Sequence, residues 1–103
     1  MQNIIQIAGV RNTDEARMLL DCGADYIGFP LRLAYHRPDL SEAQTAEIIT
    51  KLDCGLQSVL ITYLDNAREI ADLCHFLGVK TVQLHGAILP TAVRTFRRIA
   101  PDI

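Results

Sequence analysis

The sequence predicts an α/β fold in which parallel strands alternate with helices. Four short apolar runs recur along the chain, and each is followed by a segment whose apolar residues have helical spacing. The runs are apolar almost throughout, as in strands covered on both faces. The helical segments begin and end at residues that commonly cap helices. Together these observations predict four βα units that build one parallel sheet covered by helices.

The first unit joins a strand over residues 4–8 to a helix. Asn12 and Glu15 are spaced as in a capping box at a helix start, and Gly23 stands where a helix end needs a left-handed residue. The spacing therefore predicts a helix between Asn12 and Gly23.

The second unit begins with a strand over 25–31 and continues through a polar loop to Leu40. Ser41 and Gln44 then form a second capping-box pattern, and Gly55 follows the helix. We expect a strand, a long loop and a helix in that order.

The third and fourth units follow the same plan. The run over 57–63 is rich in β-branched residues, which favour a strand. Asn66 is expected to cap the start of the helix that follows, and Gly78 to mark its end. The last strand is expected over 80–85, and Pro90 suits the first turn of the last helix.

Two architectures contain such units, an open doubly wound sheet and a (β/α)₈ barrel of the TIM type. The first βα turn, residues 8–15, lacks the glycine patterns of nucleotide-binding open sheets. A complete barrel takes about 250 residues, so a chain of 103 residues is expected to be a half barrel, a single (β/α)₄ portion spanning 1–103. The residues 101–103 resemble the lead-in to a fifth strand. Two unpaired sheet edges predict a homo-oligomer or association with a missing C-terminal half.

Composition narrows the expected partners. The net charge is -2 and the longest basic run is the pair Arg97-Arg98, which argues against nucleic acid and anionic membranes. No apolar stretch approaches the roughly 20 residues of a membrane span, and no signal-peptide pattern is visible. Cys22, Cys54 and Cys74 form neither a disulfide framework nor a zinc pattern. We expect them to be buried small residues in a reducing, cytoplasmic setting, with no metal and no cofactor.

Four stretches resemble the N-terminal half of the phosphoribosylanthranilate isomerase family. Family members carry Lys-x-Cys-Gly-hydrophobic, Thr-x-x-(Asp/Glu)-Ala, Gly-Ala-Asp-x-x-Gly-Phe and Val-Gln-Leu-His-Gly. The corresponding stretches here are residues 6–10, 13–16, 23–29 and 82–86. The stretch 13–16 has one intervening residue fewer than the family pattern, and the last two stretches are intact. The resemblance covers essentially the whole chain and implies half of a (β/α)₈ barrel from tryptophan biosynthesis.

The resemblance implies an isomerase of the intramolecular aldose-ketose type. The family's reaction is the Amadori rearrangement of N-(5'-phosphoribosyl)anthranilate, a small phosphorylated substrate. A general acid opens the sugar ring and a general base removes the C2 proton. In the family the base is the cysteine that ends the first strand, while the acid and the phosphate loops come from the second half. Here Ala8 stands at the position of the base, and Gln6 at that of the family's lysine. Alanine cannot accept a proton, so Ala8 is not competent as a base.

The same resemblance assigns the remaining candidate site residues. His85 ends the fourth strand on the rim where barrel active sites are built, and Gln83 shares its face by strand alternation. Arg37 follows the second strand, where a family arginine pairs with the anthranilate carboxylate, and Arg32 competes for that role. Gly9 matches the family's glycine after the first strand and joins the predicted substrate-binding set.

Two other functions stay open at this point, and some polar residues have structural interpretations. The chain is alternatively a diverged barrel relative that binds a phosphorylated ligand without this activity, or a self-associating half barrel without catalysis. Asp25 precedes the second strand and is expected to be structural. Asp65 and Asn66 suit helix capping. The adjacent Cys74-His75 point in different directions on a helix, which argues against a metal pair.

Overall fold

A computed structural model of the chain describes residues 3–34, 37–38, 40–52 and 57–103. Strands and helices alternate as the sequence predicts. The elements, in chain order, are β1 (Gln6–Ala8), α1 (Thr13–Asp21), β2 (Tyr26–Pro30), α2 (Glu42–Leu52), β3 (Ser58–Thr62), α3 (Ala67–Leu77), β4 (Thr81–Leu84) and α4 (Pro90–Ile99).

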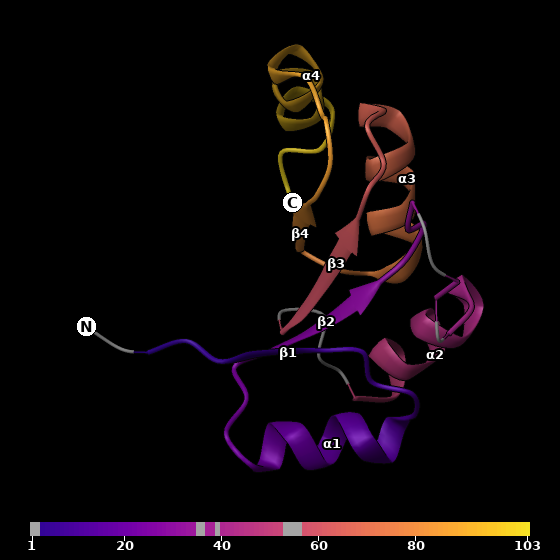
Figure 1. Ribbon diagram of the computed structural model, residues 1–103, viewed down its shortest axis with the longest axis vertical. Helices are drawn as coiled ribbons and strands as arrows, with labels where there is room; N and C mark the ends of the chain where they lie inside the picture. Colours follow the sequence, from indigo (N-terminus) through magenta and orange to yellow (C-terminus); the bar gives the residue numbers. More distant parts are fainter. Residues whose placement is uncertain (1–2, 35–36, 39, 53–56) are drawn as a thin grey trace.

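The four strands form one parallel sheet in the order β1-β2-β3-β4. In this register Ala8 pairs with Gly28, Gly28 with Val59, and Val59 with Thr81. All four helices lie along the same side of the curved sheet, and the opposite side is left uncovered (Figure 1). This arrangement is a half-barrel unit with β1 and β4 at its two edges.

The hydrophobic core fills the space between the sheet and the helices. Its centre includes side chains of the sheet and the helices, and Leu31 just after β2, that have at most 2% of their surface exposed: Ile27, Phe29, Leu31, Leu60, Ile70, Ala71, Cys74 and Leu77. Burying a leucine, isoleucine or phenylalanine side chain contributes about 1.5 to 3 kcal/mol. The core therefore fixes the helix-facing side of the sheet, and the other side is available for a site.

The first strand is shorter than the predicted range 4–8 and starts at Gln6. The carbonyl of Ile5 nevertheless accepts hydrogen bonds from the N–H groups of Asp25 and Tyr26 at 2.8 and 3.1 Å. The Asp25 carboxylate in turn accepts from the Ile5 N–H at 2.8 Å. This contact confirms the structural interpretation of Asp25. Each of the other three strands is one residue shorter at each end than predicted.

The predicted helix starts are confirmed by side-chain hydrogen bonds. The Asn12 Oδ1 atom accepts from the Glu15 N–H at 2.8 Å, which satisfies one of the free donors at the start of α1. Ser41 and Gln44 cap α2 reciprocally, with distances of 3.1 and 2.9 Å. Asn66 caps α3 through the Glu69 N–H at 3.1 Å.

The helix ends agree with the predicted glycines where the structure describes them. Gly78 ends α3 with φ +78°, and Gly23 follows α1 with φ +103°. A residue with a side chain is strained at such angles. The predicted end at Gly55 lies outside the described residues.

The cysteine prediction is correct for one residue and wrong for another. Cys74 is buried in the core, whereas Cys22 is exposed. Cys22 follows the last turn of α1, about 200° around the helix from the partly buried Leu20, and so faces water. Cys54 lies outside the described residues. In the parts of the chain that the structure describes, no helix is long and apolar enough to cross a membrane.

Candidate functional site

A hollow of about 480 Å³ lies on the uncovered face of the sheet, on the side away from the helices. We call this the strand-face hollow. Its walls come from strand ends and from the segments that follow them: Gln6, Ala8, Pro30, Leu33, Ile61, Tyr63, Gln83 and His85. Three of the predicted site residues, Ala8, Gln83 and His85, are therefore brought together here.

A chain of hydrogen bonds crosses this hollow from the first strand to the last. The Gln6 Nε2 atom donates to Gln83 Oε1 at 2.9 Å. The Gln83 Nε2 atom lies 3.0 Å from His85 Nε2. Because the Gln83 oxygen already accepts from Gln6, its amide N–H faces the imidazole. The His85 Nε2 atom is then the acceptor, and the ring proton belongs on Nδ1.

Gly28 leaves the space through which the Gln6 side chain passes. A Cβ atom at Gly28 would lie 2.6 Å from Ile61 Cδ1, 3.2 Å from Ala8 Cβ and 3.4 Å from Gln6 Nε2. The lack of a side chain at this position of β2 therefore leaves the hollow deep enough to hold the Gln6 side chain.

Ala8 ends β1 and presents only a methyl group to the strand-face hollow. His85, which directly follows β4, lines the same hollow at the other edge of the sheet. Its ring lies beside Tyr63, with ring centroids 5.7 Å apart. Position 8 therefore contributes no proton donor or acceptor to this face.

Tyr63 and Gln6 are functional candidates that the sequence analysis did not place in the site. Tyr63 directly follows β3 and is 41% exposed. Strand alternation from Ile61 would have predicted its direction, because residues two apart share a face. The contact of Gln6 with Gln83 had no such signal, since 77 residues separate them.

Gly9 and Arg37 line a second hollow of about 360 Å³, the loop hollow. It shares Pro30 and Leu33 with the strand-face hollow, so the two are neighbours. Gly9 has φ +89°, and its N–H donates to the Gly28 carbonyl at 3.3 Å. Arg37 is exposed, which leaves its guanidinium available to an anion.

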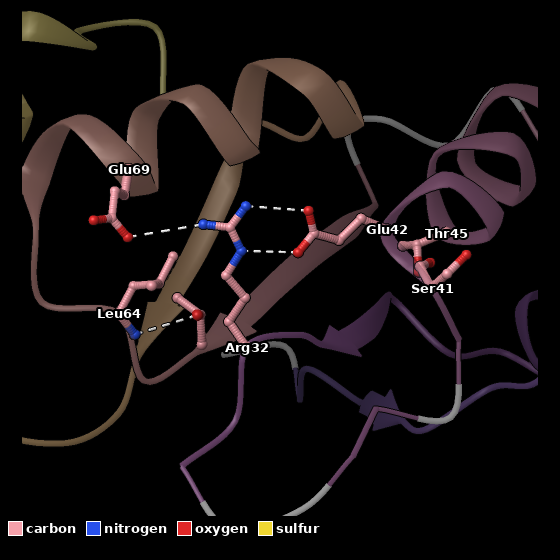
Figure 2. Close-up of polar contacts among 7 residues, drawn as sticks. Arg32, Ser41, Glu42, Thr45, Leu64 and Glu69 are labelled. Carbon is pink, nitrogen blue, oxygen red and sulfur yellow. Dashed lines mark hydrogen bonds and ion pairs between the residues drawn. The ribbon is translucent and has the colours of Figure 1, made fainter.

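Arg32 is held by carboxylates of the chain itself. Its Nε and Nη2 atoms donate to the two Glu42 oxygens at 2.8 and 3.1 Å, and Nη1 lies 3.8 Å from a Glu69 oxygen (Figure 2). Figure 2 shows the guanidinium between the start of α2 and the first turns of α3. Arg32 therefore joins two helices and lines neither the strand-face hollow nor the loop hollow.

The electrostatics of this pair agree with its geometry. The hydrogen bond from Arg32 lowers the pKa of Glu42 below its usual value, and the hydrogen bond to Glu42 raises the pKa of Arg32. Arg32 also has φ +52°, a left-handed conformation that is unfavourable for a residue with a side chain. The prediction that Arg32 binds a substrate carboxylate stays a prediction, and these contacts compete with it.

The described residues offer no group of three or more His, Cys, Asp and Glu side chains that would hold a metal ion. Cys74 is fully buried, whereas His75 is half exposed and its Nε2 lies 3.2 Å from an Asp102 oxygen. The two adjacent side chains thus point to different environments.

Comparison with known proteins identifies relatives of the whole chain. No family model matches. The chain is 33% identical over 101 residues to N-(5'-phosphoribosyl)anthranilate isomerase 2 of Methanosarcina mazei, which covers 96% of this chain and 44% of that protein. The chain is thus similar in sequence to phosphoribosylanthranilate isomerases over nearly its whole length. It spans somewhat less than half the length of the curated relatives that it matches.

Solved structures of phosphoribosylanthranilate isomerases share the fold. The enzyme from Thermotoga maritima superposes with a TM-score of 0.83 at 22% identity, over 94% of this chain and 47% of that one. Another was solved in complex with reduced 1-(o-carboxyphenylamino)-1-deoxyribulose 5-phosphate and has a TM-score of 0.84 at 21% identity, over 95% and 50% of the two chains. The half-barrel fold predicted from the sequence is thus confirmed.

Proposed function

We propose that residues 1–103 form one (β/α)₄ portion of a phosphoribosylanthranilate isomerase-type barrel and supply half of its substrate site. The observation that carries this proposal is the convergence of Ala8, Gln83 and His85 on one hollow in a chain related to these isomerases along its whole length. The proposed substrate is N-(5'-phosphoribosyl)anthranilate, and the proposed location is the cytoplasm.

The two hollows suit the two ends of such a substrate. In the loop hollow, the exposed Arg37 stands beside apolar walls, which matches the chemistry of an aromatic carboxylate. The sugar would then lie over the strand-face hollow, near Gln83 and His85. The phosphate and the general acid are assigned to the other half of the barrel.

Catalysis is expected to be slow because position 8 carries no base. General-base catalysis contributes typically about 10² to 10⁴-fold, so the methyl group of Ala8 should cost a factor of that order. This feature favours a second candidate function, in which the site binds the phosphorylated ligand and does not isomerise it. His85 is the proposed substitute base if turnover is measurable.

Binding and turnover separate the two candidates. We expect a barrel assembled from this chain and the C-terminal half of a phosphoribosylanthranilate isomerase to bind reduced 1-(o-carboxyphenylamino)-1-deoxyribulose 5-phosphate in isothermal titration calorimetry, and Arg37→Ala to weaken this binding. In the same assembly, the Ala8→Cys variant should isomerise N-(5'-phosphoribosyl)anthranilate about 10² to 10⁴ times faster than the original sequence. Asp72→Ala, which removes an exposed carboxylate of α3 away from both hollows, is the control.

Each outcome bears on a different part of the proposal. Turnover by the original chain at the rate of the Ala8→Cys variant would show that position 8 does not hold the base. Undetectable binding of the analogue by the assembled barrels, with the original sequence and with Ala8→Cys, would exclude the proposed substrate site altogether.

A further inference from the structure

The two edges of the sheet are complementary to each other. We propose that two copies of this chain associate around a twofold axis and close an eight-stranded barrel, with β4 of each copy paired to β1 of the other. This inference rests on the fold and the pairing register. In this assembly the second copy takes the place that the proposed function gives to the other half of the barrel.

The register within the chain fixes the register between copies. In a barrel of eight strands, the pairing returns to its starting strand with a shift of about eight residues. Twofold symmetry divides this shift equally between the two copies. When the pairing is followed from β1 through β2, β3 and β4 to β1 of the second copy, the register therefore shifts by roughly four residues. The observed pairing leads from Ala8, the last residue of β1, to Thr81, the first of β4. The shift thus runs toward the strand starts, and Thr81 should pair with Ile4 of the second copy.

The polar residues fit this register. Two residues further along both strands, Gln83 lies beside Gln6 of the second copy, and His85 beside Ala8 of the second copy. Because the shift is even, inward-facing side chains meet inward-facing side chains. Gln6 and Gln83 already form a hydrogen bond within one chain at 2.9 Å. Each amide has two donors and one acceptor oxygen, so the same pair is able to form again between copies.

The apolar residues near β1 also fit. Ile4 is 70% exposed and Ile5 is 50% exposed, immediately before the first strand. The proposed register places Ile4 beside β4 of the second copy. Pairing there would extend β1 toward the N-terminus and cover an apolar edge that otherwise contacts water.

The edge helices carry opposite charges. The helix α4 bears three arginines and no acidic residue, a net charge of +3: Arg94, Arg97 and Arg98. The helix α1 bears three acidic residues and one arginine, a net charge of −2: Asp14, Glu15, Asp21 and Arg17. Closure of the barrel brings α4 of one copy beside α1 of the other, since each helix flanks its own strand. The attraction favours this pairing of edges.

The mass in solution is the first test. We expect light scattering to give about 23 kDa, twice the chain mass of 11.5 kDa. Ile4→Lys should weaken the dimer at least about tenfold, a change worth about 1.4 kcal/mol, by placing a charge against β4 of the second copy. Phe76→Lys is the matched control, because Phe76 is 59% exposed on α3, which is not an edge helix. A folded chain of 11.5 kDa, or one that associates only with the other half of a relative's barrel, would overturn the proposal.

Disulfide trapping tests the register independently of affinity. Chains with Ile4→Cys and chains with Thr81→Cys are mixed in a background where Cys22 and Cys54 are serine, and circular dichroism verifies that both fold. We expect a cross-linked dimer from this mixture and much less from Ile5→Cys mixed with Thr81→Cys, because Ile5 faces the other side of the strand. Equal cross-linking by both mixtures would refute the register.

Discussion

Gln6 on β1 donates a hydrogen bond to Gln83 on β4 at 2.9 Å, although the backbones of these two strands are not neighbours in the sheet. The contact spans the uncovered face and continues to His85. The Gln83 amide thus contacts both Gln6 on β1 and the His85 imidazole, so it connects the two edge strands and orients the imidazole ring.

Replacing Gln83 with methionine should break both contacts at similar volume. We expect the free energy of unfolding to fall by about 0.5 to 1.5 kcal/mol in total, no more than for one buried hydrogen bond, because Gln83 is exposed and water can replace both partners. The His85 ring, no longer held with Nε2 as acceptor, should populate both tautomers in nitrogen-15 NMR spectra. Gln57→Met, at an exposed glutamine just before β3, is the control. A tautomer ratio that is the same in Gln83→Met and the original chain would contradict the assigned hydrogen bond.

Gly28→Ala should destabilise the chain by about 1 kcal/mol, because the new methyl group displaces the end of the Ile61 side chain and crowds Ala8 Cβ, which would lie 3.2 Å away. Its closest neighbour would be Ile61 Cδ1 at 2.6 Å. Ile61→Val removes that atom, so the double variant should lose less stability than the sum of the two single variants. Urea unfolding of all four chains measures the coupling, and strictly additive effects would count against this packing.

Two substitutions of Arg32 separate the effect of backbone strain from the effect of losing the ion pair. Both Arg32→Ala and Arg32→Gly remove the hydrogen bonds to Glu42, but only glycine relieves the left-handed backbone at φ +52°. We expect the glycine variant to be more stable than the alanine variant by about 1 kcal/mol. Thermal unfolding of the two variants side by side decides this, and a more stable alanine variant would refute the strain.

The Arg32–Glu42 pair should make stability depend on pH in the acidic range. The pKa of Glu42 is lowered in the folded chain from its ordinary value of 4.5. The unfolded state therefore takes up a proton first as the pH falls, and the stabilisation is present above 4.5 and lost below it. Glu42→Gln should cost about 0.5 to 1 kcal/mol at neutral pH, a small value because the pair is partly exposed.

The cost of Glu42→Gln should vanish below the folded-state pKa of Glu42. Glu47→Gln, on the same helix and paired with Lys51 at 2.9 Å, controls for loss of a carboxylate from α2. A stability difference that does not change between neutral and acidic pH would show that the pair does not titrate as described.

The two described cysteines should differ strongly in reactivity. Burial, reinforced by the charge of Asp102, raises the pKa of Cys74 to about 11. Its thiolate is scarce near pH 8, whereas Cys22 is exposed. Iodoacetamide followed by peptide mapping should modify Cys22 much faster than Cys74, and urea should remove the difference. Comparable rates in the folded chain would contradict the burial of Cys74.

The alternation of elements was predictable because each unit carries its own local signals. Asn12, Ser41 and Asn66 cap helices in the way that their side chains suggest, since capping depends only on residues three positions away. The strand limits were less accurate. Ile4 is apolar enough for a strand, but at a sheet edge it has one neighbouring strand instead of two.

The site was predictable where it depends on strand alternation and not where it depends on distant contacts. Gln83 and His85 share a face because they are two positions apart in the chain, as predicted. The partner of Arg32 was not foreseeable, since Glu42 and Glu69 meet its guanidinium only after α2 and α3 pack. Arg37 lines the loop hollow and not the strand-face hollow, and this separation also depends on the path of the loop.

The sequential strand order also determines when each part of the chain can fold during synthesis. Each strand pairs with the one made just before it, so a nascent chain released as far as Thr62 already contains both neighbours of β2. Native strand pairing can therefore begin with the N-terminal strands while the ribosome is still adding the later ones. The Gln6–Gln83 hydrogen bond, between residues 77 positions apart, must wait for the last strand.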